Sequence, residues 1–120
     1  MSVNKINFNS DLGEQDEIFF TKVDKPLIAQ INSANISCLF HGGYHDVVEK
    51  AVHECQKEGV SIGAHISFYD KENFGRKIQS WNKQSLYEIL QHQIQFMINI
   101  TKDLKVFENE YINFFQKISD

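Results

Sequence analysis

Cysteine is scarce in this chain of 120 residues, which has only Cys38 and Cys55. Two cysteines cannot build the disulfide framework of a small secreted domain or the cysteine cluster of a structural zinc site. Cys55 follows apolar residues at helical spacing, so we expect it to be a small core residue. Cys38 could be a nucleophile, but no sequence feature indicates a lowered thiol pKa, and packing in the core is the favoured interpretation.

Long apolar runs and excess positive charge are also missing. No apolar run approaches the roughly 20 residues that a transmembrane helix needs. Residues 1–5 lack the apolar segment of a secretory signal, so we expect a cytoplasmic protein. Acidic residues outnumber basic ones by 16 to 12, for a net charge of −4. This balance gives no electrostatic reason to expect nucleic acid or a membrane surface as a partner.

The composition is typical of a globular domain, with 42% hydrophobic and 23% charged residues. A chain of this length can bury roughly two thirds of its unfolded surface around one core. We found no internal repeat, low-complexity segment or linker. We therefore expect residues 1–120 to form a single domain.

Three short apolar stretches predict strands at residues 3–8, 27–34 and 60–63. Pro26 cannot lie inside a regular element, so we expect it to open the second strand. Between the second and third strands, residues 46–57 have the apolar stripe of a helix. Strand, helix and strand in this order predict a right-handed βαβ unit with parallel strands.

Three helices are expected in all, and two of them have a recognisable cap. Gly59 is placed to cap the helix at 46–57 in a left-handed conformation. Asn82 is a suitable N-cap for a helix with a strong apolar stripe that continues to about Thr101. Aromatic residues at spacings of three and four predict another amphipathic helix in the tail, at about 104–120.

Polar groups follow the apolar stretches in a repeated way. Residues 9–14, 33–43 and 63–65 each place a potential metal ligand or acid/base group close to the end of a predicted strand. In α/β folds, active sites collect at the carboxyl ends of parallel strands. We therefore expect the function to reside at this shared edge of the sheet.

Four sequence blocks resemble the LamB/YcsF family, the A-type subunits of bacterial ATP-dependent 5-oxoprolinase. The blocks occur in the family's order across about residues 3–95. They are residues 9–14, residues 33–43, residues 63–65 with Asp70, and residues 74–77. Family members are considerably longer, and a lysine-proline-histidine-glycine block that usually follows the helix near Thr101 is absent.

The resemblance implies a parallel (β/α) barrel of the glycoside hydrolase/deacetylase type, here truncated to about half a barrel. It also implies ATP-dependent hydrolysis of 5-oxo-L-proline to L-glutamate, with ATP as cofactor and 5-oxoprolinase subunits B and C as partners. Because a half barrel leaves open sheet edges, we also expect self-association.

Opening a lactam requires an electrophile at the carbonyl oxygen, an activated nucleophile and a proton for the leaving nitrogen. Asp11, His41 and His65, each near a different strand end, are the candidate catalytic residues. One hypothesis is that these three side chains converge on a divalent metal, because carboxylate and imidazole ligands suit zinc and similar ions. The alternative is that they act as acid/base and hydrogen-bonding groups without a metal.

Further residues are candidates for substrate contact. Arg76 is suited to a carboxylate or phosphate because its guanidinium forms a planar, bidentate fork; the alternative is a surface salt bridge with Asp70 or Glu72. Glu14 is either a second acid/base group or a solvated charge. The full set of substrate-binding candidates is Asn9, Glu14, Asn35, Asp70 and Arg76.

Three functions remain open from the sequence. The first is a 5-oxoprolinase-like subunit that works only with partners. The second is a truncated, catalytically inactive relative of such a subunit. The third is a free-standing, metal-dependent hydrolase or deacetylase-like protein that acts on another small amide.

Overall fold

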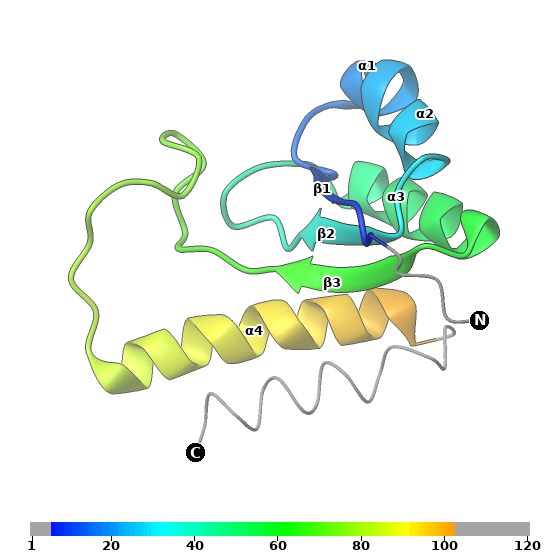
Figure 1. The fold of residues 1–120 in the computed structure, drawn as a ribbon. Helices are drawn as coiled ribbons and strands as arrows, with labels where there is room; N and C mark the ends of the chain where they lie inside the picture. Colours follow the sequence, from blue (N-terminus) through cyan, green and yellow to red (C-terminus); the bar gives the residue numbers. More distant parts are fainter. Residues whose placement is uncertain (1–5, 103–120) are drawn as a thin grey trace.

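The computed structural model describes residues 6–102 of the chain. A three-stranded parallel sheet with the order β1-β2-β3 forms its centre (Figure 1). Helix α3 packs against the sheet, and α4 lies alongside β3 and contacts α3. The main elements are β1 (Asn9–Leu12), β2 (Ser33–Ser37), α3 (His45–Glu58), β3 (Ser61–His65) and α4 (Lys83–Thr101).

The first strand lies later in the chain than predicted. Residues 6–8 are not in a strand, and the side chains of Ile6 and Phe8 are exposed. The strand position is set instead by Leu12, which is buried in the core and pairs with Ile36 of β2. Asp11 therefore lies on the strand itself and not in the turn after it.

The second strand, β2 (Ser33–Ser37), begins later than predicted and overlaps the predicted range of 27–34 only at residues 33 and 34. Pro26 lies in the first turn of α2 (Lys25–Ile28), where a helix tolerates a residue without an N–H group. This helix ends a succession of short helical segments that starts with α1 (Glu17–Phe19) and continues through the π-helix η1 (Phe20–Asp24). Ile28, at the end of α2, is fully buried in the core, whereas Ala34 is buried from β2.

The predicted βαβ unit is confirmed. Strands β2 and β3 pair in parallel, and α3 lies between them in the chain. Gly59 ends α3 with a φ of 70°, in the left-handed conformation that was predicted. The predicted N-cap of α4 is also present, because the Asn82 side chain accepts a hydrogen bond from the Ser85 N–H at 2.8 Å. The predicted tail helix at 104–120 lies outside the described residues.

The two faces of the sheet differ in polarity. Side chains alternate along each strand, so Ala34, Ile36 and Ile62 point to the face that packs on α3 and are buried there. The residues at the alternate positions, including Asp11 and Asn35, lie on the opposite face. The strands thus hold their polar side chains away from the apolar core.

The α/β class is confirmed, but a closed barrel is not. Within residues 6–102, β1 and β3 each pair with β2 alone, so the sheet is open at both edges. In this same part of the chain, none of the helices combines the length and the apolar character that crossing a bilayer would require.

Candidate functional site

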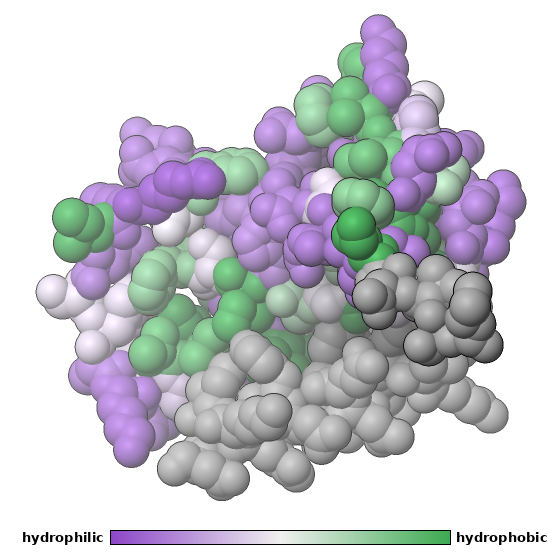
Figure 2. Space-filling view, in the orientation of Figure 1, coloured by the Kyte–Doolittle hydropathy of each residue, from purple (hydrophilic) through white to green (hydrophobic). Residues whose placement is uncertain are grey.

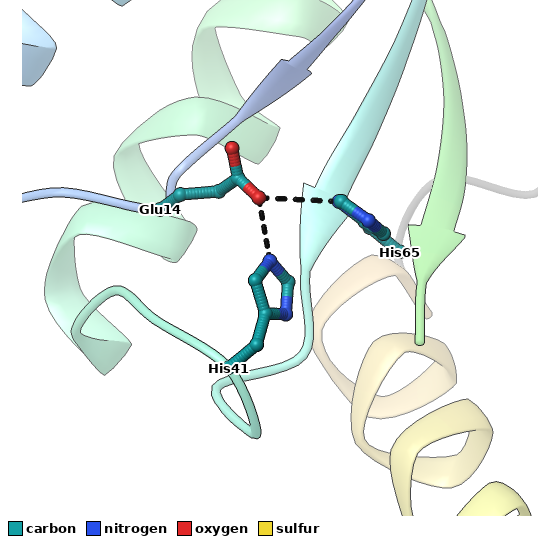
Figure 3. Close-up of side chains that lie close together, drawn as sticks. All are labelled: Glu14, His41 and His65. Atoms are coloured by element: carbon teal, nitrogen blue, oxygen red, sulfur yellow. Dashed lines mark hydrogen bonds and ion pairs between the residues drawn. The ribbon is translucent and has the colours of Figure 1, made fainter. Parts of the chain in front are cut away.

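Glu14, His41 and His65 lie together at the carboxyl edge of the sheet (Figure 3). Glu14 follows β1, His41 lies in the loop after β2, and His65 is the last residue of β3. The Glu14 Oε2 atom is 2.5 Å from His41 Nε2 and 3.4 Å from His65 Nδ1. One nitrogen or oxygen from each of the three side chains lies within 4.8 Å of the others. A carboxylate and two imidazoles therefore share one small space.

The three groups differ in their access to solvent. The side chain of His41 is 3% exposed and that of Glu14 is 13% exposed, whereas that of His65 is 31% exposed. The Nδ1 atoms of both histidines are buried and have no hydrogen-bond partner among residues 6–102. Buried ring nitrogens are normally paired, so the His41 Nδ1 atom is available to a proton, a metal ion or a substrate, whereas His65 Nδ1 already lies 3.4 Å from a Glu14 oxygen.

The loop after β2 holds His41 against Glu14. The Ser37 hydroxyl donates to the Gly42 carbonyl at 2.6 Å and accepts from the Leu39 N–H at 3.0 Å. Gly43 has a φ of 88°, and a Cβ atom at this position would lie 2.0 Å from the carbonyl oxygen of Gly13. This close backbone contact fixes the loop directly against the turn that carries Glu14.

The loop after β3 supports the other side of His41. The Phe74 ring meets the His41 ring edge to face, with the ring centroids 5.0 Å apart. Gly75 has a φ of 78°, and a Cβ atom there would lie 3.0 Å from the Cβ atom of His41. Packing from both loops therefore determines the orientation of the imidazole.

Asp11, the carboxylate predicted to join the two histidines, lies to one side of them. Its Oδ1 atom is 3.8 Å from His65 Nδ1 and accepts a hydrogen bond from the Asn35 side chain at 3.2 Å. The same Asn35 amide also donates to Asn9 at 3.1 Å. The structure thus brings His41 and His65 together, as the hypothesis requires, but the carboxylate between them is that of Glu14. A catalytic role for Asp11, His41 or His65 remains a prediction.

Asp70 uses its carboxylate to hold its own loop. One oxygen accepts from the backbone and side-chain N–H groups of Asn73, at 3.0 and 3.1 Å, and the other accepts from the Lys77 N–H at 2.9 Å. Arg76 does not pair with Asp70; its guanidinium lies 5.4 Å from the centroid of the Phe74 ring. These contacts favour a structural role for Asp70 over the predicted substrate contact.

Asp70 should make the stability of the fold depend on pH. Burial tends to raise its pKa, but the hydrogen bonds from Lys77 and Asn73 outweigh burial and lower the pKa below the ordinary value. The contribution of ionised Asp70 to the stability of the fold is thus present above the ordinary aspartate pKa and is lost as pH falls through the lowered pKa of the folded state. We expect Asp70→Asn to be less stable than the wild type at neutral pH, with a difference that shrinks in acid. Urea unfolding measured across the acidic range tests this.

Asp24 is the control for this prediction, because its pKa is shifted in the opposite direction from that of Asp70. Its side chain is buried in η1 and accepts from the Gly13 N–H at 3.0 Å. Burial and the nearby charge of Glu14 raise its pKa despite that hydrogen bond. The contribution of protonated Asp24 to the stability of the fold is therefore present below the ordinary aspartate pKa and is lost as pH rises through the raised pKa. The Asp24→Asn variant should accordingly become more stable relative to the wild type as pH rises. If both variants showed the same trend with pH, this assignment would be wrong.

The two cysteines behave as core residues. Burial raises the pKa of Cys38 to about 12, although a hydrogen bond from the His65 backbone partly opposes the shift. Burial also raises the pKa of Cys55 to about 12, with a smaller contribution from the charge of Glu54. A buried thiol that stays protonated is a poor nucleophile, so the structure supports the packing interpretation for Cys38.

A hollow of about 310 Å³ opens beside Glu14 and His41. Lys71, Phe74 and Tyr44 contribute to its wall, and the sequence had not identified any of them as a site residue. The remaining lining residues are Gln15, Asp16, Gly42 and Gly43. A cavity of about 380 Å³ near His45 and Asn99 lies between α3 and α4, away from the strand ends, so the smaller hollow is the candidate binding site.

Comparison with known proteins agrees with this architecture. A model of the LamB/YcsF family matches residues 6–111 of the chain. The fold is similar to that in a crystal structure of a lactam utilization protein from Thermus thermophilus, with a TM-score of 0.76 and 30% sequence identity. The alignment covers 85% of this chain and 41% of that protein, so this chain spans less than half the length of its structural relative.

Proposed function

Because this chain belongs to the LamB/YcsF family, we propose that it takes part in the ATP-dependent opening of 5-oxo-L-proline to L-glutamate. The observation that carries the proposal is the close contact of Glu14 with His41 and His65 at the carboxyl edge of a parallel sheet. The proposal includes the partner subunits B and C and a cytoplasmic location. It also includes completion of the open sheet into a parallel barrel, since the chain spans less than half the length of its structural relative.

The three side chains can divide the work of lactam hydrolysis. The Glu14–His41 pair is shielded from solvent and can remove a proton from the attacking water as its oxygen bonds to the lactam carbonyl carbon. His65 is more exposed and lies across the same space, where it can donate a proton to the ring nitrogen as the carbon–nitrogen bond breaks. The products are then a free amine and a carboxylate, with the proton moved from water to nitrogen.

An assay with 5-oxo-L-proline tests the function. The chain is combined with candidate subunits B and C, with and without ATP, and the release of L-glutamate is measured. We expect release only when the chain, both partners and ATP are all present. Equal release from the partners without this chain would contradict the proposal.

As an alternative to this acid/base assignment, the same three side chains form a candidate site for a divalent metal, in which Glu14 and His65 would be ligands and not the base and the acid. One carboxylate oxygen and two imidazole nitrogens suit Zn²⁺, and the arrangement of one such atom from each side chain within 4.8 Å of the others favours it. A bound metal would polarise the lactam carbonyl. We propose Glu14, His41 and His65 as the ligands, in place of the set with Asp11 that the sequence indicated.

Calorimetric titration with Zn²⁺ tests the metal site. We expect the wild type to bind Zn²⁺ and Glu14→Gln or His65→Ala to weaken binding by at least about ten-fold, because each loses one of three protein ligands. Asp11→Asn is the matched control and should bind nearly as well as the wild type. If the loss followed Asp11 and not Glu14, the proposed ligand set would be wrong.

We also propose that the chain associates with itself in the absence of other partners. Both edges of the sheet lack a neighbouring strand among residues 6–102. Figure 2 shows apolar surface near the start of α4 and the loop before it, where Ile66, Phe68, Leu86 and Leu90 line a groove. Sedimentation velocity at micromolar concentration should therefore show a dimer or larger species; a single monomeric boundary would count against association.

A further inference from the structure

The hollow beside Glu14 and His41 has an uneven distribution of charge. Glu14 and Asp16 supply negative charge to its wall, and Lys71 is the one lysine or arginine among its described lining residues. Lys71 forms no ion pair with any residue in the range 6–102. Its positive charge is thus available to a ligand inside the hollow.

The backbone at Lys71 is firmly held. The neighbouring Asp70 donates its N–H to the Phe40 carbonyl at 2.9 Å and accepts from the Gly75 N–H at 2.7 Å. Both oxygens of the Asp70 carboxylate bind N–H groups of the same loop. This network ties the loop after β3 to the loop that carries His41, so the backbone of Lys71 is held at the rim of the hollow and its exposed side chain starts from a fixed position.

We propose that Lys71 binds the carboxylate of a small cyclic amide whose lactam group lies at Glu14 and His41. The inference rests on the proposed function and adds the residue that recognises the acidic group of the substrate. A volume of about 310 Å³ suits a small ligand, and Phe74 and Tyr44 offer aromatic surface to its ring. The negative charge of Glu14 and Asp16 opposes the reverse orientation, because it would place the ligand carboxylate beside two protein carboxylates.

The sequence had suggested Arg76 for this task. Arg76 does not line the hollow, and its guanidinium lies over the ring of Phe74 instead. Lysine at position 71 is therefore better placed to reach a ligand that contacts His41. Lys77 is in the same loop and also lies outside the hollow, which makes it a matched control.

The test compares two lactams that differ in the carboxylate. Binding of 5-oxo-L-proline and of uncharged 2-pyrrolidinone is measured by ligand-observed NMR for the wild type, Lys71→Met, Lys71→Arg and Lys77→Met. We expect Lys71→Met to weaken 5-oxo-L-proline binding about ten-fold, the effect of losing one charge-assisted contact, and to leave 2-pyrrolidinone binding unchanged. Lys71→Arg should retain binding, and Lys77→Met should behave as the wild type.

The outcomes separate this inference from the proposed function. If Lys71→Met weakened both lactams equally, or neither, the assignment of Lys71 would be overturned while lactam binding stood. If the wild type bound neither lactam even with subunits B and C present, the proposed function would fail, and cyclopentanecarboxylate would then test the anion site alone. Binding of cyclopentanecarboxylate that is weakened by Lys71→Met would support the anion site at Lys71. Binding that does not depend on Lys71, or no binding, would overturn it. Lys71-dependent binding of inorganic phosphate, without Lys71-dependent binding of 5-oxo-L-proline or cyclopentanecarboxylate, would also overturn the proposal.

Discussion

Replacing Gly43 with alanine should destabilise the protein by about 3 kcal/mol, the largest effect that we expect from a single substitution on stability. Gly43 has a φ of 88°, a conformation that costs any other residue about 1 kcal/mol. The added methyl group would also lie 2.0 Å from the Gly13 carbonyl oxygen, which belongs to the backbone and cannot swing away. Relief of this clash would separate the loop that carries His41 from the turn that carries Glu14.

Gly59 offers a matched control for this substitution. Its φ of 70° is similarly left-handed, but a Cβ atom there would meet no atom within 4 Å. Gly59→Ala should therefore cost only the conformational part, about 1 kcal/mol. Urea unfolding followed by circular dichroism measures both variants. Equal losses for the two would show that the contact between Gly43 and Gly13 contributes nothing.

Under the function and acid/base assignment proposed above, replacing Glu14 with glutamine should lower the rate of 5-oxo-L-proline opening by about 10² to 10³, because the amide cannot take up the proton that a carboxylate accepts. The substitution preserves the size of the side chain, which packs 2.5 Å from His41 Nε2. We expect the variant to fold, and its unfolding midpoint should confirm this. The rate is measured with subunits B and C and ATP present.

Asp11→Asn is the control for the loss of a carboxylate near the site. The Asp11 side chain is 52% exposed, its Oδ1 atom lies 3.8 Å from His65 Nδ1, and it is not part of the cluster of Glu14, His41 and His65. Its replacement should leave most of the rate intact. A larger loss for Asp11→Asn than for Glu14→Gln would reverse the roles proposed for the two carboxylates.

The parts of the fold that the sequence predicted well are those with local signals. The helical stripe before Gly59 and the stripe after Asn82 each have a cap within a few residues, and both helices are present. The first two strands lacked such signals. Their positions depend on distant pairing, such as that of Leu12 with Ile36, and a proline that was expected to open a strand lies in a helix instead.

The shift of the first strand also explains the error over the carboxylate. With a strand predicted to end at residue 8, Asp11 would have followed it at the rim of the sheet. The strand ends instead at Leu12, so Asp11 occupies the sheet face and Glu14 reaches the rim. His41 and His65 were correctly placed together because both positions depend on the βαβ unit, whose helix is locally encoded.

Lys71 and Phe74 could not have been found by spacing. They reach the hollow because Asp70 folds its loop back on the loop of His41, through hydrogen bonds between distant parts of the chain. Phe74 also has a φ of 57°, which no propensity of phenylalanine predicts. The conformation of a long loop is decided by such tertiary contacts.

The polar face of the sheet restricts what can cover it. Asn9, Asp11 and Asn35 form a hydrogen-bonded row there, and removing their water without replacement would be costly. A polypeptide that docks on this face must therefore bring donors and acceptors of its own. Association through this face should accordingly show only a small negative change in heat capacity. Burial of apolar surface would give a large negative change instead.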